Sequence, residues 1–185
     1  RISIYNDGSF AKDPESRRSD IGHVQFINGG PVDWSAVKLG VAQSSCEAEY
    51  VGNNVGTFSL YPSLNILQFA GIKPKESDQF CDSTSATQSA RNPHSLGASR
   101  SLGIRMHGTR FAISRGHVCL KYAITEDMVA DFLTKRMPRK HLARLAVIFF
   151  NNLRPDWEAN PNALLPLRDE EWFPEIRVQD REVDE

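Results

Sequence analysis

The stretch RISIYNDGSF (residues 1–10) decides how the rest of the sequence is interpreted. Its first five residues alternate and are β-prone, which predicts a strand, and NDGS at 6–9 is typical of a strand end. Two more strands are predicted at 19–27 (SDIGHVQFI) and 32–38 (VDWSAVK), separated by the turn NGGP at 28–31. Three strands joined by short connections predict an antiparallel meander at the start of the fold.

After this meander the pattern becomes helical. Ser44 or Ser45 as the N-cap, with Glu47 in the first turn, predicts a helix from about residue 45 to residue 70. Pro62 is expected to kink this helix or to divide it in two. The elements predicted downstream are a strand at 79–82, helices at 83–91 and 97–114, a strand at 117–124, a helix from Thr125 through 135 with Thr125 as its cap, and a helix at 138–152.

Charge divides the chain into two parts. Residues 1–153 contain 18 Lys and Arg against 13 Asp and Glu, whereas residues 154–185 contain 4 against 10. The second part also contains Trp157, Trp172 and Phe173, and a purely disordered tail would be poorer in Trp and Phe. We therefore predict one domain at 1–153 and an acidic, Trp-containing extension at 154–185 that contacts this domain or a protein partner. The mildly basic domain suits a nucleic-acid partner.

Composition excludes several classes of protein. Hydrophobic residues make up 40% of the 185, enough for the core of a soluble domain. No run of eighteen apolar residues occurs, so no membrane partner is expected. Arg1 is not followed by a secretory leader. The three cysteines lack the spacing of a disulfide framework or a zinc site, which favours a reducing, intracellular compartment; they are Cys46, Cys81 and Cys119.

Four acidic residues lie at the ends of predicted elements. Asp7 ends the first strand, Glu49 lies one turn into the first helix, Asp82 ends the fourth strand and Asp131 lies in a late helix. If they converged, the four carboxylates would repel one another unless divalent cations neutralised them, and oxygen-only ligands suit Mg²⁺ or Mn²⁺. Two such ions can promote phosphodiester hydrolysis. The residues alone do not establish that the four side chains meet.

Longer blocks of sequence carry a resemblance. In chain order they are YNDGSF (5–10), DPESRRSDIGHVQFINGGPVDWSAVK (13–38), QSSCEAEYVG (43–52), FCDSTSA (80–86), IRMH (104–107) and TEDMVADFLTKRMPRKHL (125–142). Together they resemble the ribonuclease H domain of Ty1/copia-type retrotransposon polyproteins, over about residues 5–150. No single block is specific, but their shared order is.

The resemblance implies a ribonuclease H-like α/β fold: a five-stranded mixed sheet, three antiparallel strands first, flanked by helices. It implies a nuclease that cleaves the RNA strand of RNA–DNA hybrids during reverse transcription, with two Mg²⁺ or Mn²⁺ ions. Asp7, Glu49, Asp82 and Asp131 would be its catalytic metal ligands, and Glu47 competes with Glu49 for that role. A retroelement enzyme would work in the cytoplasm or nucleus, and an organelle is also compatible.

The basic residues nearest these blocks are the candidates for contacting nucleic acid. We predict this role for Arg105, His107, Arg110, Lys135 and Arg136. The alternative interpretation is a solvated basic surface.

Two departures from the family pattern motivate a different function. Residues 100–103 read RSLG where the family has Lys-His-Ile-Asp, and the helix predicted from residue 45 contains Gly52, Asn53 and Gly56, which are poor helix formers. The alternative is therefore a domesticated, catalytically silent structural or RNA-binding subunit of a larger assembly. A third alternative is an unrelated α/β binding module.

Overall fold

The structure is a computed structural model that describes residues 1–149 except 13, 41, 43, 76 and 93–99; for 100–106 it describes only the backbone. The extension predicted at 154–185, the last residues of the helix predicted at 138–152 and the side chain of Arg105 therefore lie outside the described residues.

Five strands form one sheet in the order β3-β2-β1-β4-β5. Their bounds are β1 Ile2–Ser9, β2 Asp20–Ile27, β3 Gly30–Lys38, β4 Ser77–Cys81 and β5 Cys119–Tyr122. The first three strands are antiparallel, whereas β4 runs parallel to β1 and β5 runs parallel to β4. The predicted fold class, a mixed sheet that begins with an antiparallel meander, is confirmed.

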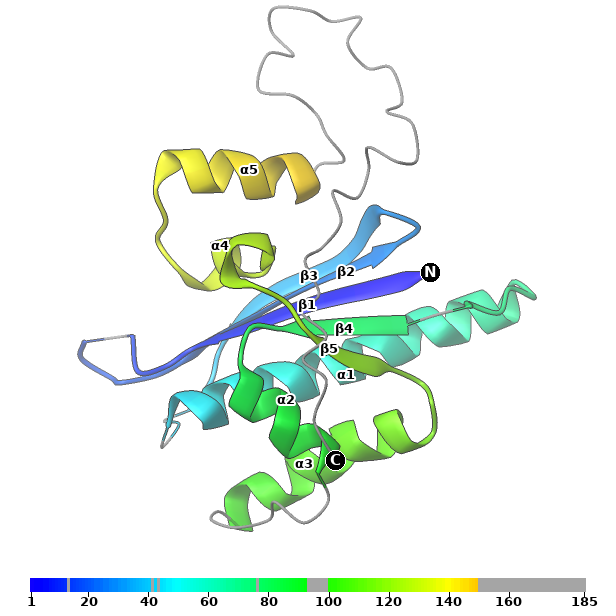
Figure 1. Cartoon of the computed structure of the whole chain (residues 1–185), viewed down its shortest axis with the longest axis horizontal. Coiled ribbons are helices and arrows are strands. Elements are labelled where there is room, and N and C mark those ends of the chain that lie inside the picture. The colour runs from blue at the N-terminus through cyan, green and yellow to red at the C-terminus, as the bar shows by residue number, and fades with distance from the viewer. Residues whose placement is uncertain (13, 41, 43, 76, 93–99, 150–185) are drawn as a thin grey trace, which may run out of the picture.

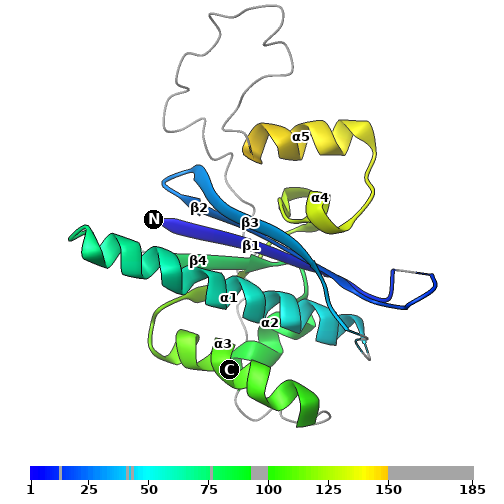
Figure 2. The ribbon, with the colours of Figure 1, turned by 180° about the vertical axis from the view of Figure 1, so that it is seen from behind.

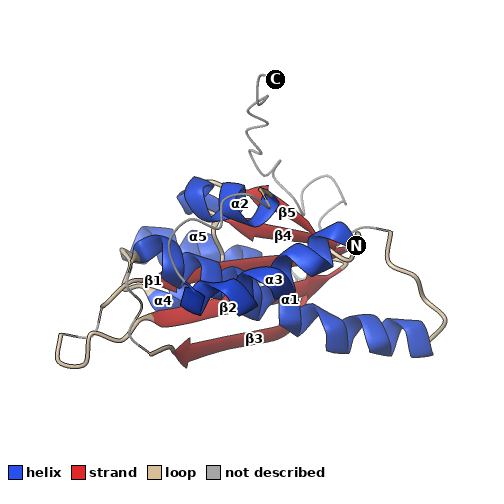
Figure 3. Ribbon diagram, turned by 90° about the horizontal axis from the view of Figure 1, so that it is seen from below, coloured by secondary structure: helices blue, strands red, loops and turns tan. Residues whose placement is uncertain are grey.

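Helices cover both faces of this sheet (Figure 1). One face carries α1 (Ser45–Phe69), α2 (Thr84–Arg91) and α3 (Arg100–Ser114), and the other carries α4 (Asp131–Thr134) and α5 (Arg139–Phe149). The view from behind shows the same three layers (Figure 2), and from below α1 and α3 lie side by side under the strands (Figure 3). None of the helices in the described part combines the length and apolar character needed to cross a bilayer.

Helix α1 is continuous from Ser45 to Phe69, so of the two outcomes expected at Pro62, a kink or a division, the division is wrong. Ser44 caps the helix as predicted, because its side chain accepts a hydrogen bond from the Glu47 backbone N–H at 3.1 Å. Pro62 lies on an exposed part of the helix, and tertiary packing of the preceding turns against the sheet outweighs its low helix propensity.

Two other predicted boundaries are also wrong. Strand β1 continues through Asp7 to Ser9, because Asp7 is paired with Gly22 on β2 and the ladder carries the chain past the expected break. The helix predicted from Thr125 is instead a 3₁₀ turn, η1 (Thr125–Asp127), followed by the short α4. Three buried apolar residues connect these two elements and pack on the sheet; they are Met128, Val129 and Ala130.

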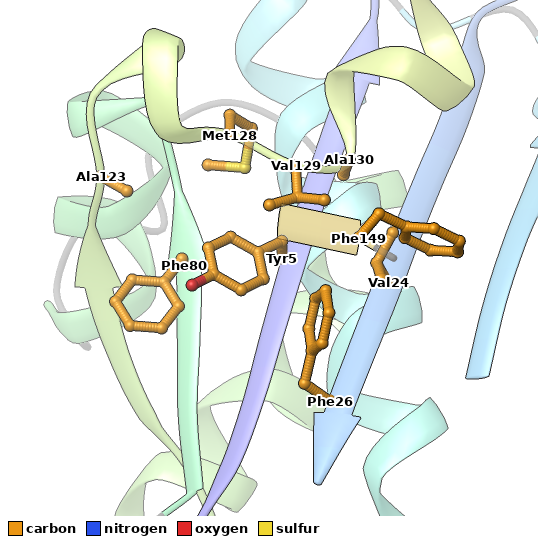
Figure 4. Close-up of a cluster of buried hydrophobic side chains, with 9 residues drawn as sticks. All are labelled: Tyr5, Val24, Phe26, Phe80, Ala123, Met128, Val129, Ala130 and Phe149. Carbon is orange, nitrogen blue, oxygen red and sulfur yellow. The ribbon is translucent and has the colours of Figure 1, made fainter. Parts of the chain in front are cut away.

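An aromatic cluster fills the space between the sheet and α4–α5 (Figure 4). Tyr5 stacks on Phe80 with ring centroids 4.9 Å apart, and Phe26 meets Tyr5 edge to face at 5.7 Å. Phe149 of α5 contacts Phe26 at 6.4 Å, so the aromatic rings attach this helix to the strands.

The opposite face of the sheet has a smaller aliphatic cluster. Ile2 and Ile4 of β1 pack there against Leu60 of α1 and against Ala112 and Val118. This cluster attaches the middle of α1 to the sheet.

Candidate metal centre

The four predicted carboxylates meet at one edge of the sheet. Asp7 lies near the end of β1 and Asp82 follows the end of β4; because these strands are neighbours and parallel, their carboxyl ends lie together. Carboxylate oxygens of Asp7, Asp82 and Asp131 lie within 4.8 Å of one another, and Glu49, Cys81 and Asp82 form an overlapping group of the same size. The convergence that the residues alone did not establish is therefore present.

Gly8 brings Glu49 to this cluster. A Cβ at position 8 would lie 2.5 Å from the backbone carbon of Ala48, so only glycine lets β1 approach the first turn of α1 this closely. The Gly8 backbone N–H then donates to Glu49 Oε2 at 3.3 Å. Glu47, the competing candidate, is in neither of the ligand groups found among the described residues.

Two threonines orient the aspartates. Thr134 Oγ1 donates a hydrogen bond to Asp7 Oδ2, and Thr125 Oγ1 donates to Asp82 Oδ2 at 3.1 Å. The Thr125 side chain thus donates to a carboxylate of the site and does not cap a helix. Ligating carboxylates in metal sites commonly receive such hydrogen bonds, which fix their orientation.

Lys135 is part of the cluster itself. Its ammonium nitrogen lies 2.8 Å from Asp7 Oδ1 and 3.0 Å from Asp131 Oδ1. The sequence did not predict this position, and the contact of Lys135 with nucleic acid stays a prediction. The spacing of four residues between Asp131 and Lys135 was the available signal, because such pairs meet on a helix.

Burial and mutual repulsion favour protonation of these acids. Burial, followed by the charges of Asp7 and Asp82, raises the pKa of Glu49 to about 9. Burial and the charge of Asp7 raise the pKa of Asp131 to about 7. Burial also raises the pKa of Asp82, with the nearby Lys135 opposing it. The raised pKa of Glu49 favours its protonated form at neutral pH.

The donor set fits a hard divalent cation. Asp7, Asp82 and Asp131 offer only oxygen, which suits Mg²⁺ or Mn²⁺, and the ammonium of Lys135 shows that a positive charge is accommodated between two of them. In the overlapping group, burial and the neighbouring Glu49 raise the pKa of the Cys81 thiol, so this sulfur stays protonated and is a poor ligand.

The remaining basic candidates lie in different environments. His107 and Arg136 are exposed. The Arg110 guanidinium donates to the backbone carbonyls of Ser89 at 2.6 Å and Asn92 at 2.7 Å, so it attaches α3 to the end of α2. The contribution of these residues to nucleic-acid binding stays a prediction.

Solved structures with the same architecture are ribonucleases H. LC11-RNase H1, isolated from compost, superposes with a TM-score of 0.57 at 18% identity, covering 72% of this chain and 92% of its own. The RNase H domain of rv2228c from Mycobacterium tuberculosis gives 0.53 at 16% identity, covering 78% and 95%. The protein described here therefore has the ribonuclease H fold.

The similarity in sequence points to a narrower group of proteins than the fold does. Over 142 residues the chain is 31% identical to the retrovirus-related Pol polyprotein from transposon RE1 of Arabidopsis thaliana, and over 136 residues it is 29% identical to that from transposon TNT 1-94 of Nicotiana tabacum. These alignments cover 75% and 73% of the chain but 10% of each polyprotein, so the chain spans about a tenth of these relatives. No family model matches the chain.

The predicted resemblance is thereby confirmed: the chain is similar in sequence to Ty1/copia-type Pol polyproteins, and its neighbours in structure are ribonuclease H domains.

Proposed function

We propose that this domain is a metal-dependent endonuclease of the ribonuclease H type, which hydrolyses the RNA strand of RNA–DNA hybrids. The observation that carries the proposal is the convergence of carboxylates from four separate segments, at positions 7, 49, 82 and 131, on the fold of ribonucleases H. A structure of LC11-RNase H1 in complex with an RNA/DNA hybrid has the same fold, with a TM-score of 0.55 at 16% identity over 72% of this chain and 94% of that one, which supports the choice of substrate.

The residues of the chain prepare a site for cations. Asp7, Asp82 and Asp131 would hold one ion, and Glu49 with Asp82 would hold a second. Bound Mg²⁺ or Mn²⁺ ions supply an activated water and stabilise the leaving oxygen in phosphodiester hydrolysis. The hydrogen bonds from Gly8 and the two threonines keep the carboxylates oriented, and Lys135 compensates part of their charge.

Cleavage of a labelled hybrid tests the proposal. The purified chain is incubated with an RNA–DNA hybrid labelled on the RNA strand, with Mg²⁺, with Mn²⁺ or with EDTA. We expect cleavage with either metal, and its loss on Asp82→Asn, because this change removes a charge shared by both ligand groups. Asp33→Asn is the matched control, since Asp33 pairs with His23 on the meander, away from the carboxylates. No cleavage with either metal would contradict the proposal.

A second candidate function is a catalytically silent structural or RNA-binding subunit. The contacts of Lys135 favour it, because its ammonium already compensates Asp7 and Asp131 without any divalent ion. Such a protein would show no cleavage and no stabilisation by Mg²⁺, and it would bind RNA or co-purify in a larger assembly. Binding of protein partners through residues 154–185 would be compatible with either function.

We also propose a reducing, intracellular setting for the domain. All three cysteines are free, with Cys81 buried and Cys119 exposed. An exposed thiol suits a compartment that keeps cysteines reduced. Fractionation of host cells with an antibody against the domain would test this, and recovery outside the cell would contradict it.

A further inference from the structure

A buried network of polar side chains lies between α1 and the sheet. Its members are Asn6 on β1, Asn53 and Thr57 on α1, and Gln79 on β4, and each is 0% exposed. Hereafter we call these four residues the amide network. Burying polar groups is unfavourable unless they form hydrogen bonds, and four of them together in a small core require a physical reason.

The amide network is fully hydrogen-bonded. Asn6 Nδ2 donates to Asn53 Oδ1 at 2.7 Å, and Gln79 Nε2 donates to Asn6 Oδ1 at 2.8 Å. Thr57 Oγ1 donates to Gln79 Oε1 at 2.9 Å, and Asn53 Nδ2 contacts Cys81 Sγ at 3.5 Å. Every side-chain nitrogen and oxygen of the four residues therefore has a partner. A satisfied network of this kind makes a core rigid and specifies one arrangement of it.

Each of the three amides in this network is close in sequence to a carboxylate of the metal centre. Asn6 directly precedes Asp7 on β1. Asn53 follows Glu49 by one helical turn, and Gln79 precedes Asp82 by three residues. The network therefore links β1, α1 and β4 to one another, close to the positions of Asp7, Glu49 and Asp82.

Gly56 permits this arrangement. A Cβ at position 56 would lie 3.0 Å from Asn6 Oδ1 and 3.2 Å from Gln79 Nε2, so a larger residue would press on the network. Asn53 and Gly56 weaken α1 as an isolated helix. Their presence is explained by the contacts that they make or permit with the strands.

We infer that the amide network positions Asp7, Glu49 and Asp82 for cation binding. Apolar contacts would hold α1 on the sheet equally well but would allow it to shift, because they have no preferred direction, whereas hydrogen bonds weaken steeply with misalignment. Ligands of a metal ion must be held to within about half an ångström. The inference rests on the proposed function and extends it, since it assigns positioning residues that do not touch the ions.

The sequence offers a matched pair of variants for the test. Gln79→Met removes the hydrogen bonds that Gln79 makes with Asn6, Thr57 and the Asn53 backbone carbonyl, at nearly constant volume. Gln25→Met substitutes another fully buried glutamine, which lies on β2, away from the acids, and accepts one hydrogen bond, from Ser59 Oγ of the same helix at 3.4 Å. Its amide nitrogen is buried without a partner among the described residues, so this control removes buried amide volume but few hydrogen bonds. Mn²⁺ affinity is measured on the whole chain by titration calorimetry, the free energy of unfolding by denaturation, and kcat and KM on the hybrid.

We expect Gln79→Met to lower Mn²⁺ affinity about tenfold or more, and Gln25→Met to change it less than about twofold. Turnover should fall with affinity in Gln79→Met while KM for the hybrid stays constant, because the network does not reach the surface. If Gln79→Met does not fold, Thr57→Val replaces it, since it removes one bond to Gln79 and preserves the shape of the side chain.

Three results would count against the inference. Gln79→Met that is less stable but binds Mn²⁺ like the wild type would show a purely structural network. Equal losses of affinity in both glutamine variants would show a general loosening of the core. A wild-type chain that binds no Mn²⁺ and cleaves nothing would instead refute the proposed function, and the inference with it.

Discussion

The two faces of the sheet are built from neighbouring residues but differ in chemistry. One face carries the aromatic cluster, and the other combines the aliphatic cluster with the amide network. Tyr5 and Phe80 point into the aromatic cluster under α4–α5, whereas Asn6 and Gln79, one residue away on the same strands, point into the amide network under α1. The alternation follows from strand geometry, in which successive side chains face opposite sides.

This difference in chemistry separates two roles, namely stabilising the fold and fixing the relative position of its elements. Packed rings remove much apolar surface from water and stabilise the fold, with a weak dependence on relative position. Hydrogen-bonded amides contribute little net stability but demand one geometry. The amides lie on the α1 side, where Glu49 has to be brought to acids carried by two strands.

The largest expected effect is on the aromatic side. Phe80→Ala removes a fully buried ring and should lower the free energy of unfolding by about 3–5 kcal/mol. Guanidinium denaturation measures this loss. The control Phe69→Ala, at a side chain that is 96% exposed, should change it by less than about 0.5 kcal/mol. The folded fraction of Phe80→Ala should bind Mn²⁺ with the affinity of the wild type. A tenfold loss of affinity would show that the aromatic cluster also positions the acids, and would contradict the contrast between the two faces.

The next effect is a pH dependence confined to the carboxylates. In the metal-free protein, burial and Asp7 raise the pKa of Glu49 from 4.5 to about 9 and that of Asp131 from 3.8 to about 7. The folded state therefore retains protons that the unfolded state releases, so stability present at acidic pH is lost as pH rises, by about 1.4 kcal/mol per pH unit for each carboxyl. Burial raises the pKa of Tyr5 far above this range, so Tyr5 of the aromatic cluster does not contribute to the pH dependence of stability there.

Denaturation in EDTA between about pH 6 and pH 8 measures this slope. Glu49→Gln should flatten the part above pH 7, since Gln cannot ionise. A wild-type protein whose stability is independent of pH in this interval would show that the carboxylates are not held as the structure describes.

A smaller effect is expected from the amide side. Gly56→Ala places a methyl group 3.0 Å from Asn6 Oδ1 and should lower the free energy of unfolding by about 1–3 kcal/mol. Mn²⁺ affinity, measured by calorimetry, should fall as well. Gly40→Ala, where a Cβ would meet nothing within 4 Å, is the control. If Gly56→Ala lost stability but kept its Mn²⁺ affinity, the amide network would only stabilise the fold, as the aromatic cluster does.

The smallest effect concerns Lys135. Lys135→Met should destabilise the metal-free protein by about 1 kcal/mol, because Asp7 and Asp131 lose their shared partner and the lysine is partly exposed. Saturating Mg²⁺ should remove the difference in melting temperature from the wild type. Arg136→Met, at the exposed neighbouring cation, should alter neither state. A difference that persists in Mg²⁺ would show that Lys135 has a separate structural role.

The sequence was sufficient for the sheet and for the elements that carry the acids. Alternating side chains predicted the meander, and the ordered motifs implied the parallel strands and the quartet of carboxylates. Pro62 suggested a divided helix and NDGS at 6–9 suggested an early strand end. Both predictions fail because local propensity is weaker than the packing of a helix on a sheet or the pairing of a strand along its length.

The interior of the site could not be predicted in this way. Lys135 meets Asp7 across 128 positions of sequence, and no local pattern reports such a contact. Asn53 and Gly56 counted only as poor helix formers, because their partners Asn6 and Gln79 lie on strands that are distant in the sequence.

The parallel pairing of β1 with β4 also has a consequence for the order of folding. Ile2 lies opposite Ile27 on β2 and Ser77 on β4, so β1 has one neighbour that is close in the sequence and one that is synthesised much later. Contacts of such separation form late. Asp131 and Lys135 follow β4 in the sequence, so Asp7, Glu49 and Asp82 are synthesised before the lysine that pairs with Asp7 and Asp131. We therefore expect the ion pair of Lys135 with Asp7 to form only when α4 packs on the sheet.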